Sequence, residues 1–351
     1  MNDAEIRVAL IGYGLGGQSF HAPVIATTPG MRLAAIVTGN AERQRLARTE
    51  HPDARVVDTA DELFRVHTET DLVVISTPNR THVPLAMQAI DAELPVVVDK
   101  PVAPTSAEAR RLAEEAKRRN VFLSVYHNRR WDGDFQTLRR LIKDRALGHV
   151  LRFESRLDRW RPAPKGGWRE LDAPEEAGGL LYDLGTHLID QALCLFGPVA
   201  DVYAELDKRR PGIAVDDDVF LALTHASGVR SHLWATVMAA QDGPRLRVLG
   251  DRAAYTKFGT DVQEAALRRG ERPSAPNWGV DPPENYGLLG VGQDARPVAT
   301  ERGDYRGFYI GVVRSIREGA PPPVDVRDAI AALEVIETAR RRAQPPGLPP
   351  A

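Results

Sequence analysis

Three residues in the segment 178–190 have side chains that can move a proton. The segment reads GGLLYDLGTHLID, and it places Asp183, His187 and Asp190 at helical spacings in an otherwise apolar run. Residues three or four apart lie on one side of a helix, so a helix here would present a carboxylate and an imidazole on a buried face. Such a pair can transfer a proton near neutral pH. The pattern also fits a core histidine and a helix-start carboxylate, with Asp190 as a structural hydrogen-bonding group.

A glycine-rich turn near the N-terminus predicts a dinucleotide site. An apolar run at 6–11 leads into GYGLGG at 12–17, which satisfies GxGxxG between a predicted strand and a predicted helix. In that context the first glycine permits the tight turn, the second admits the pyrophosphate, and the third packs helix against strand. The predicted cofactor-binding residues of this turn are Gly12, Gly14, Leu15 and Gly17.

The end of the second predicted strand indicates which cofactor is bound. An NAD-preferring fold usually carries an acidic residue there, which binds the ribose 2′-hydroxyl. This chain has Thr38 instead, followed by Asn40 and Arg43. Thr38 and Asn40 have groups that can hydrogen-bond a 2′-phosphate, and Arg43 can balance its charge. We therefore expect NADP, with NAD as the other possibility; Arg43 and Arg45 also fit the solvated face of the next helix.

Two further strand ends carry polar groups. The fourth strand is followed by STPNRTH at 76–82, and the strand at 96–99 is followed by Lys100 and a proline. The carboxyl edge of an open α/β sheet is where nucleotides and catalytic groups lie. The alternatives are a helix cap at Asn79 and a surface lysine extending from a strand end. From these loops we predict cofactor contacts by Thr77, Pro78, Asn79, His82 and Lys100.

These residues depend on two kinds of predicted scaffold. Up to residue 125, continuous apolar runs alternate with helical patterns near 18–27, 41–49, 82–92 and 106–119, which predicts a doubly wound parallel Rossmann sheet. From residue 126 on, alternating runs at 150–157, 199–207, 219–224 and 229–237 predict an α+β domain with a large open, mostly antiparallel sheet. The expected domains are therefore 1–125, which binds the dinucleotide, and 126–351, which binds substrate and forms the oligomer.

The bulk properties exclude several classes of protein. A formal net charge of −2 gives no indication of a nucleic-acid partner, and no apolar stretch approaches the ~20 residues of a membrane span. The single cysteine, Cys194, lies in the apolar run ALCLF and is expected to be a buried thiol. We expect a cytoplasmic protein. Outside 178–190 no cluster has metal-ligand spacing, and no metal site is predicted.

Four motifs in register resemble one family, the Gfo/Idh/MocA oxidoreductases. They are GYGLGG at 12–17, TPNRTH at 77–82, DKP at 99–101 and GGLLYDLGTHLID at 178–190. The family's usual EKP appears here as DKP, which keeps the lysine and the proline. GQSFHAPVI at 17–25, SVYHNRRWDGDF at 124–135, ESRLDRWRP at 154–162 and NWGVDPPENYG at 277–287 look like the NADP-dependent scyllo-inositol dehydrogenase-type branch.

The resemblance implies the chemistry. It predicts an enzyme that transfers a hydride between NADP and a secondary alcohol of a cyclic polyol or sugar. His187 would be the general base, Lys100 would stabilise the charge on the reacting oxygen, and Asp183 would support both. These three are also predicted to contact substrate, together with Asn128, Arg130, Trp131, Arg159 and Trp168. The family's open sheet usually packs on another subunit, which predicts a homodimer or homotetramer.

Two other functions fit the same fold. One is a nucleotide-sensing regulator without catalysis, which the retained Lys100 and His187 disfavour. The other is an NAD-dependent glycosidase, which uses its cofactor transiently and regenerates it in each cycle. Stoichiometric turnover of NADPH distinguishes a dehydrogenase from such a glycosidase.

Overall fold

The chain folds into two compact units. The computed structural model describes residues 4–164, 166–170 and 173–343. The first unit runs up to residue 131 and also includes 262–279 and 304–329; the second contains 132–261, 280–303 and the chain from 330 onward. The first unit thus contains the segment predicted as the dinucleotide-binding domain together with later pieces of the chain.

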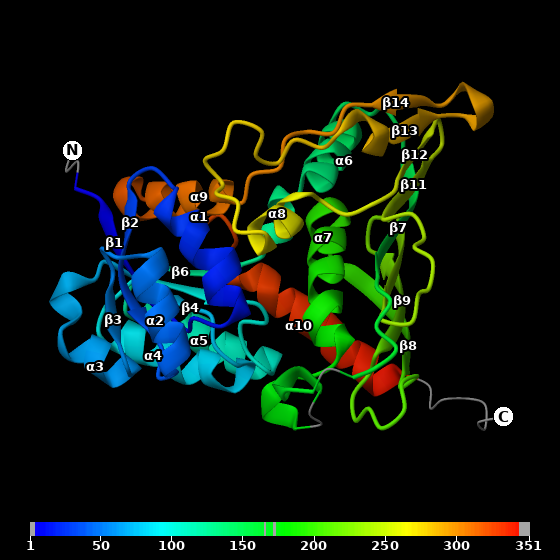
Figure 1. Ribbon diagram of the computed structural model, residues 1–351. Coiled ribbons are helices and arrows are strands. Elements are labelled where there is room, and N and C mark those ends of the chain that lie inside the picture. The colour runs from blue at the N-terminus through cyan, green and yellow to red at the C-terminus, as the bar shows by residue number, and fades with distance from the viewer. Residues whose placement is uncertain (1–3, 165, 171–172, 344–351) are drawn as a thin grey trace. The chain divides into compact units, whose positions relative to one another are not determined.

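A six-stranded parallel sheet forms the centre of the first unit, in the order β3-β2-β1-β4-β5-β6 (Figure 1). The chain starts in the middle of this sheet and extends it to both edges, which confirms the predicted doubly wound arrangement. All residues of β4 and β6 are buried, as the apolar sequence of β4 and the largely apolar sequence of β6 indicate. The strands are β1 (Ile6–Ile11), β2 (Met31–Val37), β3 (Arg55–Val57), β4 (Leu72–Ile75), β5 (Val96–Asp99) and β6 (Leu123–Tyr126).

The helices of this sheet lie close to the predicted ranges. They are α1 (Ala22–Ala26), α2 (Ala41–Glu50), α3 (Ala60–Arg65), α4 (His82–Asp91) and α5 (Ser106–Arg118). The helix predicted near 18–27 starts as a π-helical turn, η1 (Gly16–His21), and continues as α1. No residue range was predicted for β3 or α3, because elements of three and six residues are too short to show a periodic pattern.

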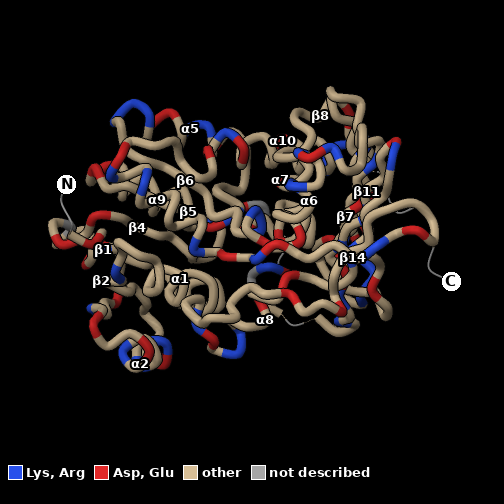
Figure 2. The backbone as a smooth tube through the Cα atoms, turned by 90° about the horizontal axis from the view of Figure 1, so that it is seen from above, with Lys and Arg blue, Asp and Glu red and all other residues tan. Residues whose placement is uncertain are grey.

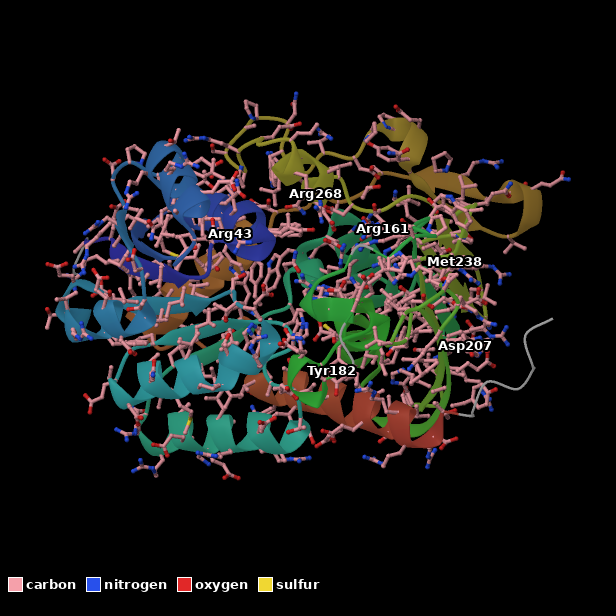
Figure 3. All side chains as sticks on the ribbon, turned by 60° about the horizontal axis from the view of Figure 1, so that its bottom comes forward. Arg43, Arg161, Tyr182, Asp207, Met238 and Arg268 are labelled. Carbon is pink, nitrogen blue, oxygen red and sulfur yellow. The ribbon has the colours of Figure 1, made fainter. Side chains whose placement is uncertain are left out.

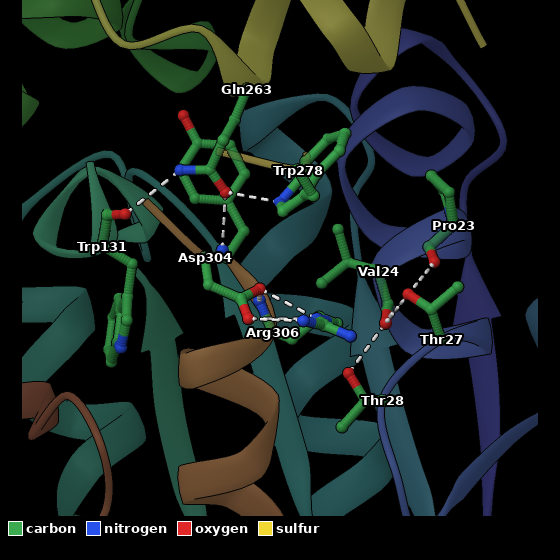
Figure 4. Close-up of polar contacts among 10 residues, drawn as sticks. Pro23, Val24, Thr27, Thr28, Trp131, Gln263, Trp278, Asp304 and Arg306 are labelled. Carbon is green, nitrogen blue, oxygen red and sulfur yellow. Dashed lines mark hydrogen bonds and ion pairs between the residues drawn. The ribbon is translucent and has the colours of Figure 1, made fainter. Parts of the chain in front are cut away.

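Gln263 joins three separate stretches of chain within the first unit (Figure 4). Its side-chain nitrogen donates to the backbone oxygen of Trp131 at 3.1 Å. Its side-chain oxygen accepts from Nε1 of Trp278 at 3.1 Å and from the backbone nitrogen of Tyr305 at 2.8 Å. Because Gln263 and Trp278 are buried, these bonds attach the segments carrying α8 (Gln263–Arg268) and α9 (Arg306–Glu318) to the end of the Rossmann sequence.

The second unit contains an eight-stranded sheet in the order β14-β13-β12-β11-β7-β10-β9-β8. All its pairings are antiparallel except that of β7 with β10, which confirms the prediction of a mostly antiparallel sheet. Burial alternates residue by residue along β9 and β10, so one face of the sheet is covered. The strands are β7 (Val150–Asp158), β8 (Val199–Asp207), β9 (Asp218–His225), β10 (Arg230–Thr236), β11 (Leu246–Gly250), β12 (Ala254–Lys257), β13 (Gly287–Gly290) and β14 (Arg296–Val298).

Helix α7 (Thr186–Phe196) packs against β7 and β10 and supplies much of the covering layer. The expectation of a buried Cys194 is wrong: its side chain is exposed. The first two turns of α7, residues 186–192, are buried on all sides, whereas Cys194 lies in the last turn, where Phe196 is buried and position 194 is exposed. The other long helices are α6 (Gly133–Lys143) and α10 (Val326–Arg342).

Charges of both signs are interspersed along the described chain, as Figure 2 shows. None of the described helices is both long and apolar enough to span a lipid bilayer.

Candidate active site

The first and third glycines of the fingerprint, Gly12 and Gly17, have no room for side chains. Gly12 has a φ of +101°, and a Cβ atom there would lie 2.2 Å from the backbone oxygen of Ser76. A Cβ atom at Gly17 would lie 1.9 Å from the backbone oxygen of Gly12. The turn is therefore held against both the next strand end and its own helix, as a pyrophosphate-binding turn requires.

The second glycine is open, in contrast to its neighbours. The nearest atom to a Cβ at Gly14 would be Nη1 of Arg43, at 3.8 Å, and the side chain of Leu15 is half exposed. Space above Gly14 leaves the backbone approachable by a phosphate group, and the adjacent guanidinium supplies positive charge. These residues fit a dinucleotide.

The end of β2 is organised around the start of α2. The side-chain oxygen of Asn40 accepts from the backbone nitrogen of Arg43 at 3.0 Å and so caps α2. The backbone oxygen of Thr38 accepts from the side chain of Gln44 at 2.8 Å, and Thr38 itself is buried. Arg43 is exposed at the first turn of this helix and is marked in Figure 3. The oxygen of Asn40 is thus engaged in capping, while Arg43 lies beside the glycine turn.

The loop after β4 is closed by hydrogen bonds of its own. Thr81 donates through its hydroxyl to Oγ1 of Thr77 and to the backbone oxygen of Pro78, both at 2.7 Å. Thr81, not Asn79, precedes α4, and Asn79 is buried in a short 3₁₀ turn. The alternative of Asn79 as the cap of α4 is therefore wrong.

His82 connects this loop to the residues after Lys100. Its ring nitrogens lie 2.8 Å from the backbone oxygen of Pro101 and 2.9 Å from that of Thr77. Burial lowers the pKa of His82, against the opposing charge of Asp99. This buried position holds two strand-end loops together, and direct contact of His82 with the cofactor stays a prediction.

Lys100 follows the last residue of β5, Asp99, whose carboxylate is well supplied with donors. Its Oδ1 accepts from the backbone nitrogen of Lys100 at 2.8 Å, and its Oδ2 accepts from the hydroxyl of Ser76 at 3.1 Å. Burial raises the pKa of Asp99, but the hydrogen bond and charge of His21 and the charge of Lys100 outweigh it and hold the pKa below its usual range. An ionised carboxylate therefore adjoins the predicted catalytic lysine.

The predicted substrate residues after β6 make internal contacts. Residues Asn128–Trp131 form a 3₁₀ turn in which Arg130 pairs with Asp328 at 3.0 Å. The ring of Trp131 stands edge-on to Phe308 and would lie 2.3 Å from a Cβ atom at Gly307. Its neighbour Arg129 pairs with Glu264 at 2.7 Å. These contacts fix the turn within the first unit, and substrate binding by Asn128, Arg130 and Trp131 stays a prediction.

The segment 178–190, which is predicted to handle the proton, lies in the second unit. It is helical from Leu181 on, first as a π-helical turn (Leu181–Gly185) and then as α7. His187 and Asp190 are buried on α7, whereas the side chain of Asp183 is about a quarter exposed (28%). The predicted helix is confirmed. Its π-helical start changes the spacing between Asp183 and His187 from that of a regular α-helix.

Asp216 holds the start of this segment and was not predicted from the sequence. Its Oδ2 accepts from the backbone nitrogen of Leu181 at 2.7 Å. Gly179 has a φ of +93°, and a Cβ atom there would lie 2.3 Å from Oδ1 of Asp216. Burial raises the pKa of Asp216. Gly179 thus makes room for this carboxylate; Asp216 stands in a run of three aspartates that gave no periodic signal.

A loop residue, Arg169, contacts Asp183 and was also missed. Its Nε lies 3.6 Å from Oδ1 of Asp183, and its backbone oxygen accepts from the nitrogen of Gly179 at 2.9 Å. The other predicted substrate residues of this unit are Arg159, whose backbone nitrogen donates to Thr236, and Trp168, whose side chain lies outside the described part of the structure.

The predicted residues are thus divided between the two units. The cofactor-binding set, Lys100 and the 128–131 turn belong to the first, and Arg159, Trp168, Asp183 and His187 belong to the second. Within 4–164, 166–170 and 173–343, no group of three or more histidine, cysteine, aspartate or glutamate side chains is arranged to hold a metal ion.

Two family profiles match nearly the whole chain. Residues 6–127 match an oxidoreductase family's NAD-binding Rossmann fold, and residues 139–347 match the C-terminal alpha/beta domain of the same family, Gfo/Idh/MocA. Among curated proteins, the chain is 40% identical over 335 residues to the uncharacterized oxidoreductase YdgJ of Escherichia coli (strain K12), covering 95% of each. It is 35% identical over 338 residues to scyllo-inositol 2-dehydrogenase (NADP(+)) IolW of Bacillus subtilis (strain 168), covering 95% of this chain and 92% of that protein.

Solved structures resemble the chain over similar lengths. The putative oxidoreductase yvaA from Bacillus subtilis superposes with a TM-score of 0.91 at 34% identity, covering 98% of this chain and 97% of its own.

Proposed function

Because the chain belongs to the Gfo/Idh/MocA family of NAD(P)-binding oxidoreductases, we propose that it interconverts a secondary alcohol and a ketone on a cyclic polyol or sugar. The observation that carries the proposal is Lys100, which stands at the carboxyl end of a Rossmann strand beside the ionised Asp99. That edge of the sheet is where a nucleotide and its reaction partner bind. A regulator without catalysis has no use for a lysine held there.

The proposed cofactor is NADP. The strand end at Thr38 carries no acidic side chain to bind a ribose hydroxyl, and the Arg43 guanidinium lies beside the open Gly14. An arginine at this place suits a 2′-phosphate, which it can bind by a charge-assisted hydrogen bond. The contacts assigned to this cofactor are those of Gly12, Gly14, Leu15, Gly17, Thr38, Asn40, Arg43, Thr77, Pro78, Asn79, His82 and Lys100.

The protein's own residues handle the proton and the charge. His187 takes the proton of the substrate hydroxyl at a ring nitrogen and returns it when the ketone is reduced. Lys100 donates a hydrogen bond to the reacting oxygen and stabilises its negative charge. Asp183 supports both groups electrostatically. When bound, the nicotinamide accepts or supplies the hydride.

The substrate class follows from the donors available and from the relative named for scyllo-inositol. Rings with many hydroxyl groups suit a site with amide, guanidinium and indole groups, which Asn128, Arg130, Trp131, Arg159 and Trp168 provide. Such enzymes differ in the polyol or sugar that they use, so we propose the substrate class and no single compound.

We further propose a homo-oligomer formed through the C-terminal sheet. Tyr203, Phe220, His232 and Trp234 make neighbouring ring contacts on the face of β8–β10 that alternates away from the core. Contiguous aromatic surface of this kind is typical of subunit interfaces. A cytoplasmic location is part of the same proposal, on the basis of the single cysteine.

A substrate screen tests the function. The purified protein is incubated with inositols, aldoses and their ketones, with NADP(H) or NAD(H), and the nicotinamide absorbance is followed. Stoichiometric change with a polyol or sugar supports the proposal. Cofactor binding without turnover of any compound points to a regulator, and hydrolysis of a glycoside without net cofactor consumption points to the glycosidase.

A further inference from the structure

A line of three side chains, two of them buried, runs behind the strand end that carries Lys100. Tyr309 lies on α9, His21 ends the turn after the glycine loop, and Asp99 ends β5. Nδ1 of His21 lies 2.6 Å from the hydroxyl oxygen of Tyr309, and its Nε2 lies 3.4 Å from Oδ2 of Asp99. His21 and Tyr309 have no exposed surface. The line therefore connects the core of the first unit to the carboxylate beside Lys100.

The groups on either side of the imidazole differ in protonation. Burial raises the pKa of Tyr309 well above its ordinary value, so the phenol keeps its proton and shares one hydrogen bond with Nδ1 of His21. Asp99 is ionised, and Nε2 of His21 lies 3.4 Å from its Oδ2, where a protonated ring forms an ion pair with it. Tyr309 thus supports a ring whose other nitrogen adjoins the carboxylate next to Lys100.

Other groups that face Asp99 come from four elements. Ser76, after β4, donates to Oδ2, and the backbone nitrogen of Lys100 donates to Oδ1. The charges of Lys100 and of His82 on α4 also act on the carboxylate, and Tyr126 of β6 packs on the His21 ring with centroids 4.2 Å apart. Ser76 and the backbone of Lys100 donate to different oxygens of the carboxylate, and His21 approaches the Ser76-bonded oxygen from the core.

We propose that His21, held by Tyr309, is a positioning residue for Lys100: it occupies the Asp99 carboxylate and so leaves the lysine ammonium available to the reacting oxygen. A carboxylate next to a lysine competes with the substrate for that ammonium. A donor already directed at the carboxylate weakens the competition, because part of the negative charge is compensated. The inference rests on the role proposed for Lys100.

The test measures the reactivity of Lys100 directly and needs no substrate. The intact protein is acetylated briefly at a series of pH values, and peptide mass spectrometry gives the extent of labelling at each lysine. Lys117 and Lys143 are exposed and serve as internal standards in every sample. In His21→Met the Asp99 charge acts on Lys100 without compensation, and we expect the labelling curve of Lys100 to move by about one pH unit to higher pH, with the standards unchanged.

Three further variants separate positioning from packing. His21→Gln retains an N–H near the place of Nε2 and should restore most of the parental curve. Tyr309→Phe keeps the ring but removes the hydroxyl that is hydrogen-bonded to His21, and it should shift the curve in the same direction by less. Tyr126→Phe is its matched control, because it also removes a buried phenol beside His21, one that bonds to the backbone oxygen of Phe20; its curve should coincide with the parent's.

Coincident Lys100 curves in the parent and His21→Met overturn the proposal. If His21→Met does not fold, Tyr309→Phe decides, and a curve that coincides with the parent's has the same meaning. Activity is measured separately: kcat should fall by roughly tenfold in His21→Met, with the KM for NADPH unchanged. A shifted curve in a protein that turns over no polyol or sugar would leave the positioning role intact and refute the proposed function instead.

Discussion

The backbone of Gly12 lies against the carbonyl oxygen of Ser76, so closely that a Cβ atom at Gly12 would come within 2.2 Å of it. Ser76 in turn donates to Asp99, the residue before Lys100. The ends of β1, β4 and β5 are therefore in direct contact behind the glycine turn. The cofactor turn and the proposed catalytic lysine share one support.

Replacement of Gly12 by alanine should cost both stability and cofactor binding. The left-handed φ costs about 1 kcal/mol for any residue with a Cβ, and displacement of the Ser76 carbonyl raises the total to about 3 kcal/mol. Gly319→Ala is the matched control, because Gly319 also has a positive φ (+68°) but no atom within 4 Å of the added Cβ. Urea unfolding and NADPH titration check both. Equal losses in the two variants would contradict the contact-based argument.

Arg43→Ala should weaken NADPH binding much more than NADH binding. Loss of a charge-assisted contact to the 2′-phosphate corresponds to about a tenfold rise in the Kd for NADPH. Thr38→Asp should act in the opposite sense and favour NADH, because a carboxylate repels the phosphate and accepts from a ribose hydroxyl. Fluorescence titration measures both constants. Arg45→Ala is the control on the same helix, and parental NADPH affinity in Arg43→Ala would remove the argument for NADP.

Lys100→Met and His187→Ala should each lower kcat by at least about 100-fold, because one removes the stabilising charge and the other the base. NADPH affinity should change by no more than roughly threefold, since the glycine turn remains. Steady-state kinetics on the substrate found in the screen, with a separate binding titration, provide the measurement. Parental kcat in both variants would disprove the assigned chemistry.

Gly179→Ala should impair catalysis without affecting the nucleotide. The added Cβ would lie 2.3 Å from Oδ1 of Asp216, whose other oxygen holds the start of the helical segment with Asp183 and His187. We expect kcat/KM for the substrate to fall by about tenfold or more while NADPH binding is retained. Gly197→Ala, with a φ of +77° and open space around it, is the control. A loss of the same size in that variant would indicate a general effect of strained backbone.

His225 should make the protein less stable in mild acid. Its Nδ1 lies 2.8 Å from the backbone oxygen of Gly197 and its Nε2 lies 2.8 Å from the hydroxyl of Ser231, which suits the neutral ring. Burial lowers the pKa of His225 from 6.5, so the unfolded chain binds the proton first. The contribution of neutral His225 to the stability of the folded protein is therefore complete above about pH 6.5. It is lost as the pH falls toward the lower pKa of His225 in the folded state.

The test compares the change in Tm between about pH 7.5 and pH 5.5 in three proteins. His225→Gln cannot titrate, so its Tm should fall less over this interval than the parent's. The exposed His149 gives the control, His149→Gln, which should follow the parent. If His225→Gln loses as much Tm as the parent, the histidine does not contribute to the pH dependence.

Local patterns in the sequence determined the Rossmann sheet and the position of its key residues. The apolar runs of β1, β4, β5 and β6, the glycine turn and the lysine after β5 are recognisable because each depends on neighbours within a few residues. The same holds for the helix at 186–196 and the alternation along β9 and β10. Their side chains alternate or recur with the period of the backbone itself.

Contacts between distant residues were decided only by the tertiary structure. His21 and Tyr309 are 288 positions apart, Gln263 binds the backbone of Trp131, and Asp216 binds the backbone of Leu181. The sequence shows each of these as an isolated histidine, glutamine or aspartate, because no periodic pattern relates them. The predicted site residues thus belong to local patterns. The residues that support Lys100 and the segment before Asp183 come together only in the folded chain, because buried polar groups need hydrogen-bond partners.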